Sequence, residues 1–382
     1  MRQIFSVPLF REHSRCRARL NSLTQSPCSI AGRHFPFIFA LLLSLCFSLF
    51  PLAPQESAFP EEFVSLFEKV ELEELPPADD YYIDDSPLNQ ILKLFDEEDY
   101  ARQKAFLEQK KRKVIKNAAG IEIPNTSYAQ DKIHDFLARY MTNFGKQNLC
   151  KILDDGELYR LYVRQELKKR NLPALLEFLP VVESEYKATA KSRSGARGLW
   201  QFMENSMAPF LKKNDWIDER LDPWKATGAA LSKLQDNYRV LGDWPLAIGA
   251  YNCGLGAMSR ALKKSKTKTF WALAEQRLIP EETINYVPKL LAIAEIAENG
   301  SEYNVSLPLA NENIRYDDFD YVTTSSVYSL EWLSNELRMD ESILKKLNGS
   351  LLKEKTPPFE YRLRIPVGFA FSVAELLGLD TF

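Results

Sequence analysis

LPALLEFLPVVES, residues 172–184, places a glutamate on the apolar face of a predicted helix. Leu172, Leu176 and Leu179 are spaced by four and three residues, and the next step of four falls on Glu183. A carboxylate among apolar neighbours is unfavourable unless it is protonated or paired, because burial disfavours its charged form and raises its pKa. The position therefore indicates a general acid, although a solvated structural glutamate fits the same pattern.

A second stretch, SRSGARGLWQFM at residues 192–203, follows within twenty residues. Gly195 and Gly198 allow tight backbone turns, Trp200 supplies a flat apolar surface, and Gln201 supplies a neutral amide that can donate and accept hydrogen bonds. Flat apolar surfaces beside neutral polar groups suit the binding of sugars. The alternative is structural, with the aromatic residues in the core and the glycines at turns.

Two further motifs contain tyrosine and asparagine side chains. AYNCG at residues 250–254 places Tyr251 and Asn252 at the end of a predicted helix, and NYVPK contributes Tyr286. A nucleotide-binding interpretation of GLGAMS, residues 254–259, fails because a helix and not a strand precedes Gly254 and because the third glycine of that motif is absent.

Residues 126–301 are predicted to form an all-helical domain, since apolar residues recur there at helical spacing and no alternating strand pattern is present. Asp222 with Pro223 has the form of an N-cap followed by proline at the first helical position. Other predicted starts lie at Thr126, Asp243 and Pro280, with stops at Gly242, Gly254 and Gly300. The fold class is therefore mainly α.

A small α+β module is predicted at residues 317–369, in the order strand, helix, helix, strand. Its expected core residues are Val327, Leu330, Leu333, Leu337, Ile343 and Leu347. The rest of the chain differs from both domains in charge.

Residues 1–53 contain six arginines and one acid, Glu12, in their first 35 positions, followed by an apolar run. This order predicts either a cleaved signal peptide or a single-span anchor through residues 36–53. Residues 54–125 are predicted to be an acidic, partly disordered spacer, with one short helix near residues 88–95. Both readings of the leader take the bulk of the chain out of the cytoplasm, to the periplasm or cell envelope.

The composition of the 382 residues, 45% hydrophobic and 26% charged with a net charge of −3, predicts a protein with a substantial core. It leaves no basic surplus for nucleic acid. Three scattered histidines are too few for a zinc site. Beyond the leader only Cys150 and Cys253 remain, as one bridge or as two free thiols.

The motifs ES, GLWQFM, AYNCG and ETINYVP, in this order and spacing, resemble the lytic transglycosylases of the soluble-transglycosylase (SLT) catalytic domain, relatives of goose-type lysozyme, and especially the membrane-bound D-type murein transglycosylases. The resemblance covers roughly residues 126–300. It implies a lysozyme-like helical fold. The C-terminal module resembles a degenerate LysM unit, which implies either glycan binding or a structural cap on the catalytic domain.

The resemblance also implies residue roles. Glu183 would be the single catalytic acid/base, with Ser184 and Gly198 supporting the turns. Tyr286 would hydrogen-bond near the glutamate and help to position it. The remaining substrate-binding residues would be Ser192, Gln201, Met203, Tyr251 and Asn252.

The implied reaction cleaves the β-1,4 bond between N-acetylmuramic acid and N-acetylglucosamine in peptidoglycan glycan strands. Glu183 would protonate the glycosidic oxygen and then take the proton of the C6 hydroxyl, which closes a 1,6-anhydro ring. We expect no metal, no cofactor and no nucleic acid partner. The chain is expected to be a monomer. The alternatives are a hydrolytic muramidase of the same fold and a non-catalytic peptidoglycan-binding protein.

Overall fold

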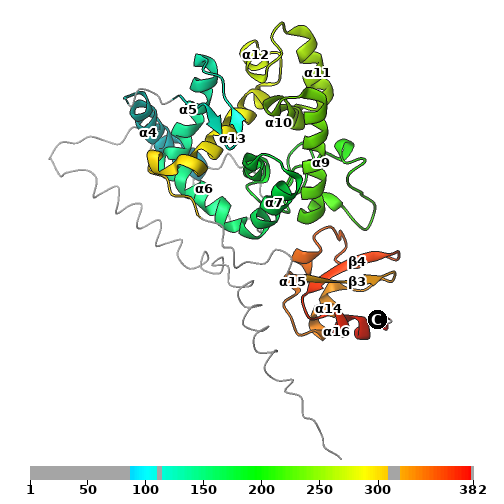
Figure 1. Ribbon diagram of the computed structural model, residues 1–382. Coiled ribbons are helices and arrows are strands. Elements are labelled where there is room, and N and C mark those ends of the chain that lie inside the picture. Colours follow the sequence, from blue (N-terminus) through cyan, green and yellow to red (C-terminus); the bar gives the residue numbers. More distant parts are fainter. Residues whose placement is uncertain (1–86, 110–113, 309–318, 380–382) are drawn as a thin grey trace, which may run out of the picture. The chain divides into compact units, whose positions relative to one another are not determined.

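The computed structural model describes residues 87–109, 114–308 and 319–379 (Figure 1). The expected signal or anchor at residues 1–53 lies outside the described residues. Among the helices that are described, none combines the length and the apolar character needed to cross a membrane.

The helical body is built from short and medium helices, and a long irregular segment joins α8 to α9 (Figure 1). Its α-helices are α4 (Pro87–Gln109), α5 (Ser127–Met141), α6 (Asn143–Asp155), α7 (Glu157–Arg170), α8 (Leu179–Ser184), α9 (Pro223–Leu241), α10 (Trp244–Cys253), α11 (Leu255–Lys264), α12 (Phe270–Glu275) and α13 (Glu281–Asn299). Short 3₁₀ turns lie at Ala174–Phe178, Glu204–Ser206, Glu219–Leu221 and Gly300–Tyr303. The all-helical prediction for this domain is confirmed.

Side-chain caps explain where these helices begin and end. Asp222 accepts hydrogen bonds from the backbone nitrogens of Trp224 and Lys225 at the start of α9. Asp243 does the same for α10, and Gly242 ends α9 in the left-handed conformation with φ of 68°. The predicted starts and stops of α9 and α10 are therefore confirmed.

Helix α13 is the central helix of the body and is buried along most of its length. Apolar residues surround it, as expected of a helix inside a core. It packs against α5 and α10, and it lies close to the short α8 that carries Glu183. Because α13 also carries Tyr286, its position decides the geometry around this glutamate.

The segment around residue 180 differs from the single bent helix that the leucine spacing predicts. A 3₁₀ turn over Ala174–Phe178 leads into the six-residue helix α8, and Pro180 stands near the start of α8. Proline fits there because the first backbone N–H groups of a helix have no intrahelical partner. Glu183 thus comes from a short separate helix.

The folded body begins before residue 126. Helix α4 packs against α5, and the strands β1 (Asn117–Ala118) and β2 (Ile121–Glu122) pair antiparallel. Ile115, Ala118 and Ile121 are buried in the main core. The acidic spacer expected over residues 54–125 is therefore too long at its C-terminal end, because residues 87–109 are helical and the apolar side chains of residues 115–123 complete the core.

The C-terminal module pairs β3 (Phe319–Thr324) antiparallel with β4 (Tyr361–Pro366), and its helices are α14 (Leu330–Glu336), α15 (Glu341–Leu347) and α16 (Ala370–Leu376). The predicted order is confirmed. The module continues past residue 369, since Val373 of α16 is fully buried. Val327, expected in the core, is 45% exposed. Leu344 of α15, which was not among the expected core residues, is buried.

A loop of the helical body packs into this module. Ile217 belongs to the module's apolar core, and the backbone nitrogen of Asp218 donates to the carbonyl of Ser350 at 2.8 Å. Arg364 of β4 donates to Asp222, the cap of α9, at 2.6 Å, and both side chains are almost fully buried. The module is thus joined to the start of α9, which the Asp222–Pro223 pair predicts.

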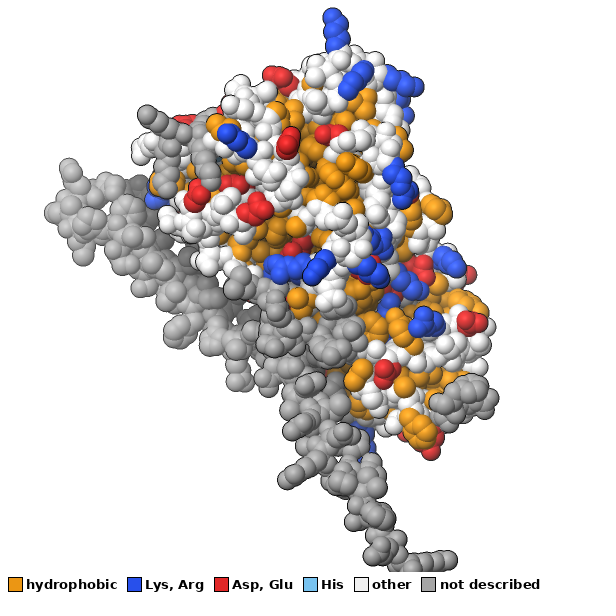
Figure 2. All heavy atoms as spheres, viewed as in Figure 1, with side chains coloured by type: hydrophobic (Ala, Val, Ile, Leu, Met, Phe, Trp, Pro, Cys, Tyr) orange, Lys and Arg blue, Asp and Glu red, His pale blue; other side chains and the backbone are white. Residues whose placement is uncertain are grey.

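Charged side chains of both signs lie among apolar ones on the face shown in Figure 2. Among the exposed large apolar residues of the described parts are Val240, 64% exposed, and Phe371, 66% exposed. Such residues are common on protein surfaces when they stand singly, so they do not by themselves indicate an interface.

Candidate active site

Glu183 is the next-to-last residue of α8, and its surroundings are fixed by the sharp turn that follows. Glu185 and Tyr186 have positive φ angles of 52° and 60°, which ends the helix and reverses the chain. Ser184 is buried and donates from Oγ to the carbonyl of Leu199 at 2.8 Å. This bond connects α8 to the glycine-rich loop.

Two tyrosines from different helices surround the Glu183 carboxyl. The hydroxyl of Tyr286, on α13, donates a hydrogen bond to Oε1 of Glu183. Tyr251, on α10, interacts electrostatically with both groups, and both tyrosines are at most 7% exposed. Glu183 is half-buried as a residue, and its carboxyl is surrounded by protein atoms.

Burial raises the pKa of Glu183 to about 7. The hydrogen bond from Tyr286 and the positive charges of Lys233 and Lys289 act in the opposite direction, while the negative charge of Glu282 adds to the rise. A carboxyl with a pKa near neutrality can carry a proton and release it in the same reaction, which suits a general acid that later acts as a base.

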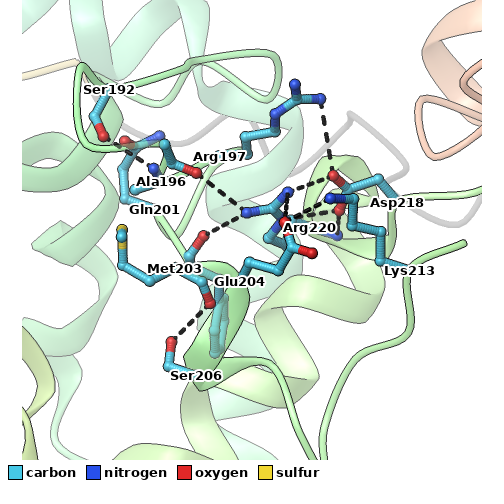
Figure 3. A network of polar contacts seen from close by, with 12 residues as sticks. Ser192, Ala196, Arg197, Gln201, Met203, Glu204, Ser206, Lys213, Asp218 and Arg220 are labelled. Carbon is cyan, nitrogen blue, oxygen red and sulfur yellow. Dashed lines mark hydrogen bonds and ion pairs between the residues drawn. The ribbon is translucent and has the colours of Figure 1, made fainter.

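The loop from Ser192 to Phe202 is held by Arg220, whose side chain lies beside it (Figure 3). The guanidinium group donates to the carbonyls of Gly195 and Phe202 at 3.2 and 3.3 Å, and its other nitrogens bind both carboxylate oxygens of Asp218 at 2.9 and 2.7 Å. Arg220 is 2% exposed and Asp218 fully buried, so this pair fixes the loop from the core side.

Gly198 is required by both its conformation and its surroundings. Its φ is +79°, and an added Cβ would lie 1.8 Å from the carbonyl oxygen of Arg220. Its backbone nitrogen donates to the carbonyl of Ala190 at 2.8 Å. The backbone can therefore pass Arg220 only without a side chain.

Gln201 and Ser192 form hydrogen bonds mainly within this loop. Gln201 has a positive φ of 46°, and its amide nitrogen donates to the carbonyls of Gly198 and Ala190 at 2.9 and 3.2 Å. The hydroxyl of Ser192 accepts from the backbone nitrogen of Ala196 at 3.0 Å. Met203 is 36% exposed, so its thioether is available to a ligand (Figure 3).

Aromatic residues form the floor next to Glu183. Trp200 is fully buried and its indole nitrogen donates to Thr227 of α9 at 2.9 Å. The hydroxyl of Tyr251 donates to the carbonyl of Trp200 at 2.9 Å, and its ring meets that of Phe202 edge to face at 6.1 Å. Trp200 is thus a structural residue, and Tyr251 ties α10 to the backbone of the glycine-rich loop.

Asn252 is held by the first turn of α13. Its amide nitrogen donates to Glu282 at 2.9 Å, and its carbonyl oxygen accepts from the hydroxyl of Thr283 at 2.6 Å. The side chain therefore ties the end of α10 to the helix that carries Tyr286. Cys253, next in sequence, and Cys150 are both free thiols.

Three residues that matter to this geometry escape the sequence reasoning. Arg220 and Thr227 form hydrogen bonds with the loop. The ammonium group of Lys233 lies over the rings of Phe202 and Tyr251, 5.4 and 5.0 Å from their centres. Arg220 stands in the stretch DERLDP, residues 218–223, whose alternating charges fit a surface ion pair equally well. In the parts of the chain that are described, no cluster of three or more His, Cys, Asp or Glu residues could hold a metal ion.

Residues 161–274 match the family model of the transglycosylase SLT domain. The chain is 35% identical over 189 residues to membrane-bound lytic murein transglycosylase D of Escherichia coli strain K12, and to the protein of that name from strain O6:H1; each alignment covers 48% of this chain and 40% of the relative. The solved lytic transglycosylase Slt of Pseudomonas aeruginosa, an inactive mutant, is similar with a TM-score of 0.36 and 20% identity, over 60% of this chain and 34% of the other. The chain thus spans about 40% of the length of the curated relatives it matches.

Proposed function

We propose that this chain, which carries a transglycosylase SLT domain related to those of lytic murein transglycosylases, is itself a peptidoglycan lytic transglycosylase. The observation that carries the proposal is the Glu183 carboxyl, whose pKa is about 7 and which accepts a hydrogen bond from Tyr286. Glu183 lies inside the residues that match the domain, and Tyr286 follows shortly after them.

In the proposed reaction, protonated Glu183 gives its proton to the glycosidic oxygen that joins N-acetylmuramic acid to N-acetylglucosamine. The N-acetyl carbonyl of the muramyl residue stabilises the anomeric centre from the opposite side, so a second protein carboxylate is not required. Glu183, now a carboxylate, removes the proton of the C6 hydroxyl, and the C6 oxygen closes the 1,6-anhydro ring. The proton count balances and no water is consumed.

The site residues have distinct proposed roles. Tyr286 positions the Glu183 carboxyl through its hydrogen bond. Tyr251 and Asn252 form the wall on the side of α10, while Ser192, Gln201 and Met203 meet the sugars from the glycine-rich loop. Ser184 ties that loop to α8 through the bond from its hydroxyl to the carbonyl of Leu199, and Gly198 supports the turn through the bond from its backbone nitrogen to the carbonyl of Ala190.

The experiment is a digest of purified sacculi followed by mass spectrometry of the muropeptides. A transglycosylase leaves anhydro ends, which lack the mass of one water relative to the ends that a hydrolytic muramidase leaves. Glu183→Gln should keep the fold and release no product. Reducing ends in place of anhydro ends would establish the hydrolase, and activity in the purified glutamine variant would refute Glu183 as the acid.

The proposed location is the periplasm or cell envelope. The basic leader and apolar run in residues 1–53 support export, and the related Escherichia coli protein is named membrane-bound. Fractionation of cells that express the full chain tests this. Recovery from the membrane fraction would favour an anchor through residues 36–53, recovery from the periplasm would favour cleavage, and a cytoplasmic protein would contradict export.

The C-terminal module has two proposed uses. Its resemblance to LysM supports glycan binding. The buried contact between Arg364 and Asp222 supports the other use, in which the module is a structural cap on the helical body. Co-sedimentation of the protein with insoluble sacculi separates them, with Glu183→Gln used to prevent digestion. Loss of binding when Tyr321 and Trp332, 40% and 38% exposed, are replaced by alanine would establish glycan binding by the module.

A further inference from the structure

Lys233, on α9, occupies an unusual environment for a lysine. Its ammonium group lies 5.0 Å from the centre of the Tyr251 ring and 5.4 Å from that of Phe202. The side chain is half-buried. Within the described ranges it has no hydrogen bond and no carboxylate within ion-pair distance, whereas Lys225 of the same helix binds Glu219 at 2.7 Å.

Glu183 is the negatively charged group that interacts with Lys233. The two side chains interact electrostatically, and both interact with Tyr251, whose ring lies 5.0 Å from the Lys233 ammonium group and whose pKa is raised by burial and by the negative charge of Glu183. Burial lowers the pKa of Lys233, and the negative charge of Glu183 raises it. The cation therefore stands in a poorly hydrated place, where its attraction to a nearby carboxylate is weakened less than it would be in bulk water.

Other groups face Glu183 from the helices around it. Helix α13 contributes Tyr286, Glu282 and Lys289; Tyr251 comes from α10 and Lys233 from α9. Glu282 opposes ionisation of Glu183, and Lys289 favours it. Lys289 also interacts with Glu185, so its charge is shared between two carboxylates. Lys233 lacks such a second carboxylate.

We infer that Lys233 is a positioning residue for the proposed reaction, whose ammonium group stabilises the Glu183 carboxylate after this group has protonated the glycosidic oxygen. The inference rests on the proposed function for its catalytic meaning, although the charge coupling is a property of the unliganded protein. The rings of Phe202 and Tyr251 hold the ammonium group through cation–π contacts. These rings carry no negative charge, so they do not neutralise the charge of Lys233.

This arrangement assists the first step of the reaction and leaves the proton balance unchanged. The proton passes from Glu183 to the leaving oxygen, and the negative charge that remains on the carboxyl is compensated by Lys233. When the carboxylate takes the proton of the C6 hydroxyl, the compensation ends and the starting state is restored. Lys233 keeps its own proton throughout.

The test is a direct titration of Glu183 in the protein without substrate. Carbon-13 labelling of glutamate side chains gives a carboxyl signal for Glu183, which Glu183→Gln assigns by its disappearance. In Lys233→Met, which keeps the apolar stem over the rings, the titration midpoint should rise by roughly half a pH unit or more. Lys233→Arg should restore the original midpoint.

The matched control is Lys225→Met, which removes the same charge from the same helix where it binds Glu219. It should leave the midpoint of Glu183 unchanged. In activity assays on sacculi, the alkaline limb of kcat/KM should move to higher pH in Lys233→Met, and the plateau should fall at least about threefold. A structural defect would lower the plateau without moving the limb.

An unchanged Glu183 midpoint in folded Lys233→Met overturns the inference, and so does an equal shift in Lys225→Met. Thermal melting of each variant shows whether the fold is retained. If the wild-type protein releases no muropeptides, the proposed function fails, but the titration still decides whether Lys233 compensates the charge of Glu183. The two failures are therefore distinguishable.

Discussion

The hydroxyl of Tyr286 donates a hydrogen bond to the carboxyl of Glu183 across 103 positions of the chain. The bond joins the central helix α13 to the short helix α8, so the two residues meet only when the core has formed. It also opposes the effect of burial, since it stabilises the ionised carboxyl that burial destabilises. The chemistry of the site therefore depends on one contact between distant segments.

We expect Tyr286→Phe to reduce the activity on sacculi roughly ten- to a hundredfold, as expected for the loss of a hydrogen bond to a charged group. Removal of the donor should also raise the pKa of Glu183 further, because the carboxylate loses a stabilising partner. Steady-state kinetics and the carboxyl titration measure both effects. Tyr303→Phe, which removes a hydroxyl bonded to Glu295 in the same core, is the control and should leave the pKa unchanged.

The pH dependence of the proposed activity follows from the pKa of Glu183. As a general acid the group must be protonated in the free enzyme, so kcat/KM should fall tenfold per pH unit above about 7. The profile is measured on solubilised glycan between pH 5 and 9. A plateau that extends beyond pH 9 would contradict this assignment of the acid.

Replacement of Glu183 by glutamine should stabilise the protein at neutral and alkaline pH. The pKa is about 7 in the folded state against an ordinary value of 4.5, so between these values the folded chain holds a proton that the unfolded chain has lost. Wild-type stability from this group therefore falls as pH rises through that window, and glutamine does not titrate. The difference in Tm, variant minus wild type, should grow from pH 4.5 to 7 and then remain constant.

Gly198→Ala should destabilise the fold by about 2 kcal/mol or more, since the positive φ and the contact with the Arg220 carbonyl both oppose a side chain. Gly195→Ala is a matched control in the same loop. Its φ is also positive, at +89°, but an added Cβ would have no atom within 4 Å. Urea denaturation should show a smaller loss for Gly195→Ala, and equal losses would refute the steric explanation.

The ion pair between Arg364 and Asp222 should be important for the catalytic domain, although Arg364 belongs to the C-terminal module. Arg364→Met leaves the buried carboxylate of Asp222 without its partner and should cost about 3 kcal/mol. Arg362→Met, two residues away on the exposed side of β4, removes only a contact with the Tyr321 ring and should cost far less. Chemical denaturation of both variants measures the difference.

Local signals in the sequence correctly predicted most helix limits in the helical body. Asp222, Asp243 and Gly242 act within one turn of their own backbone, so their effect can be predicted without knowledge of the fold. The strand–helix–helix–strand order of the C-terminal module was predictable for the same reason. The limits of the folded body were not, because the core contacts of Leu107 and of residues 115–123 involve helices that follow later in the chain.

For the site, the pattern of residues was enough to predict that a glutamate interrupts an apolar stripe and that glycine, aromatic and amide side chains follow it in a fixed order. The groups that surround this glutamate could not be predicted in this way, since Tyr286, Tyr251 and Lys233 come from three different helices that the fold brings together. Burial and charge depend on distances in space, and neighbours in space are set by the packing of whole helices. The residue type therefore supplies a carboxyl that can bind and release a proton, and the packing sets the pKa at which it does so.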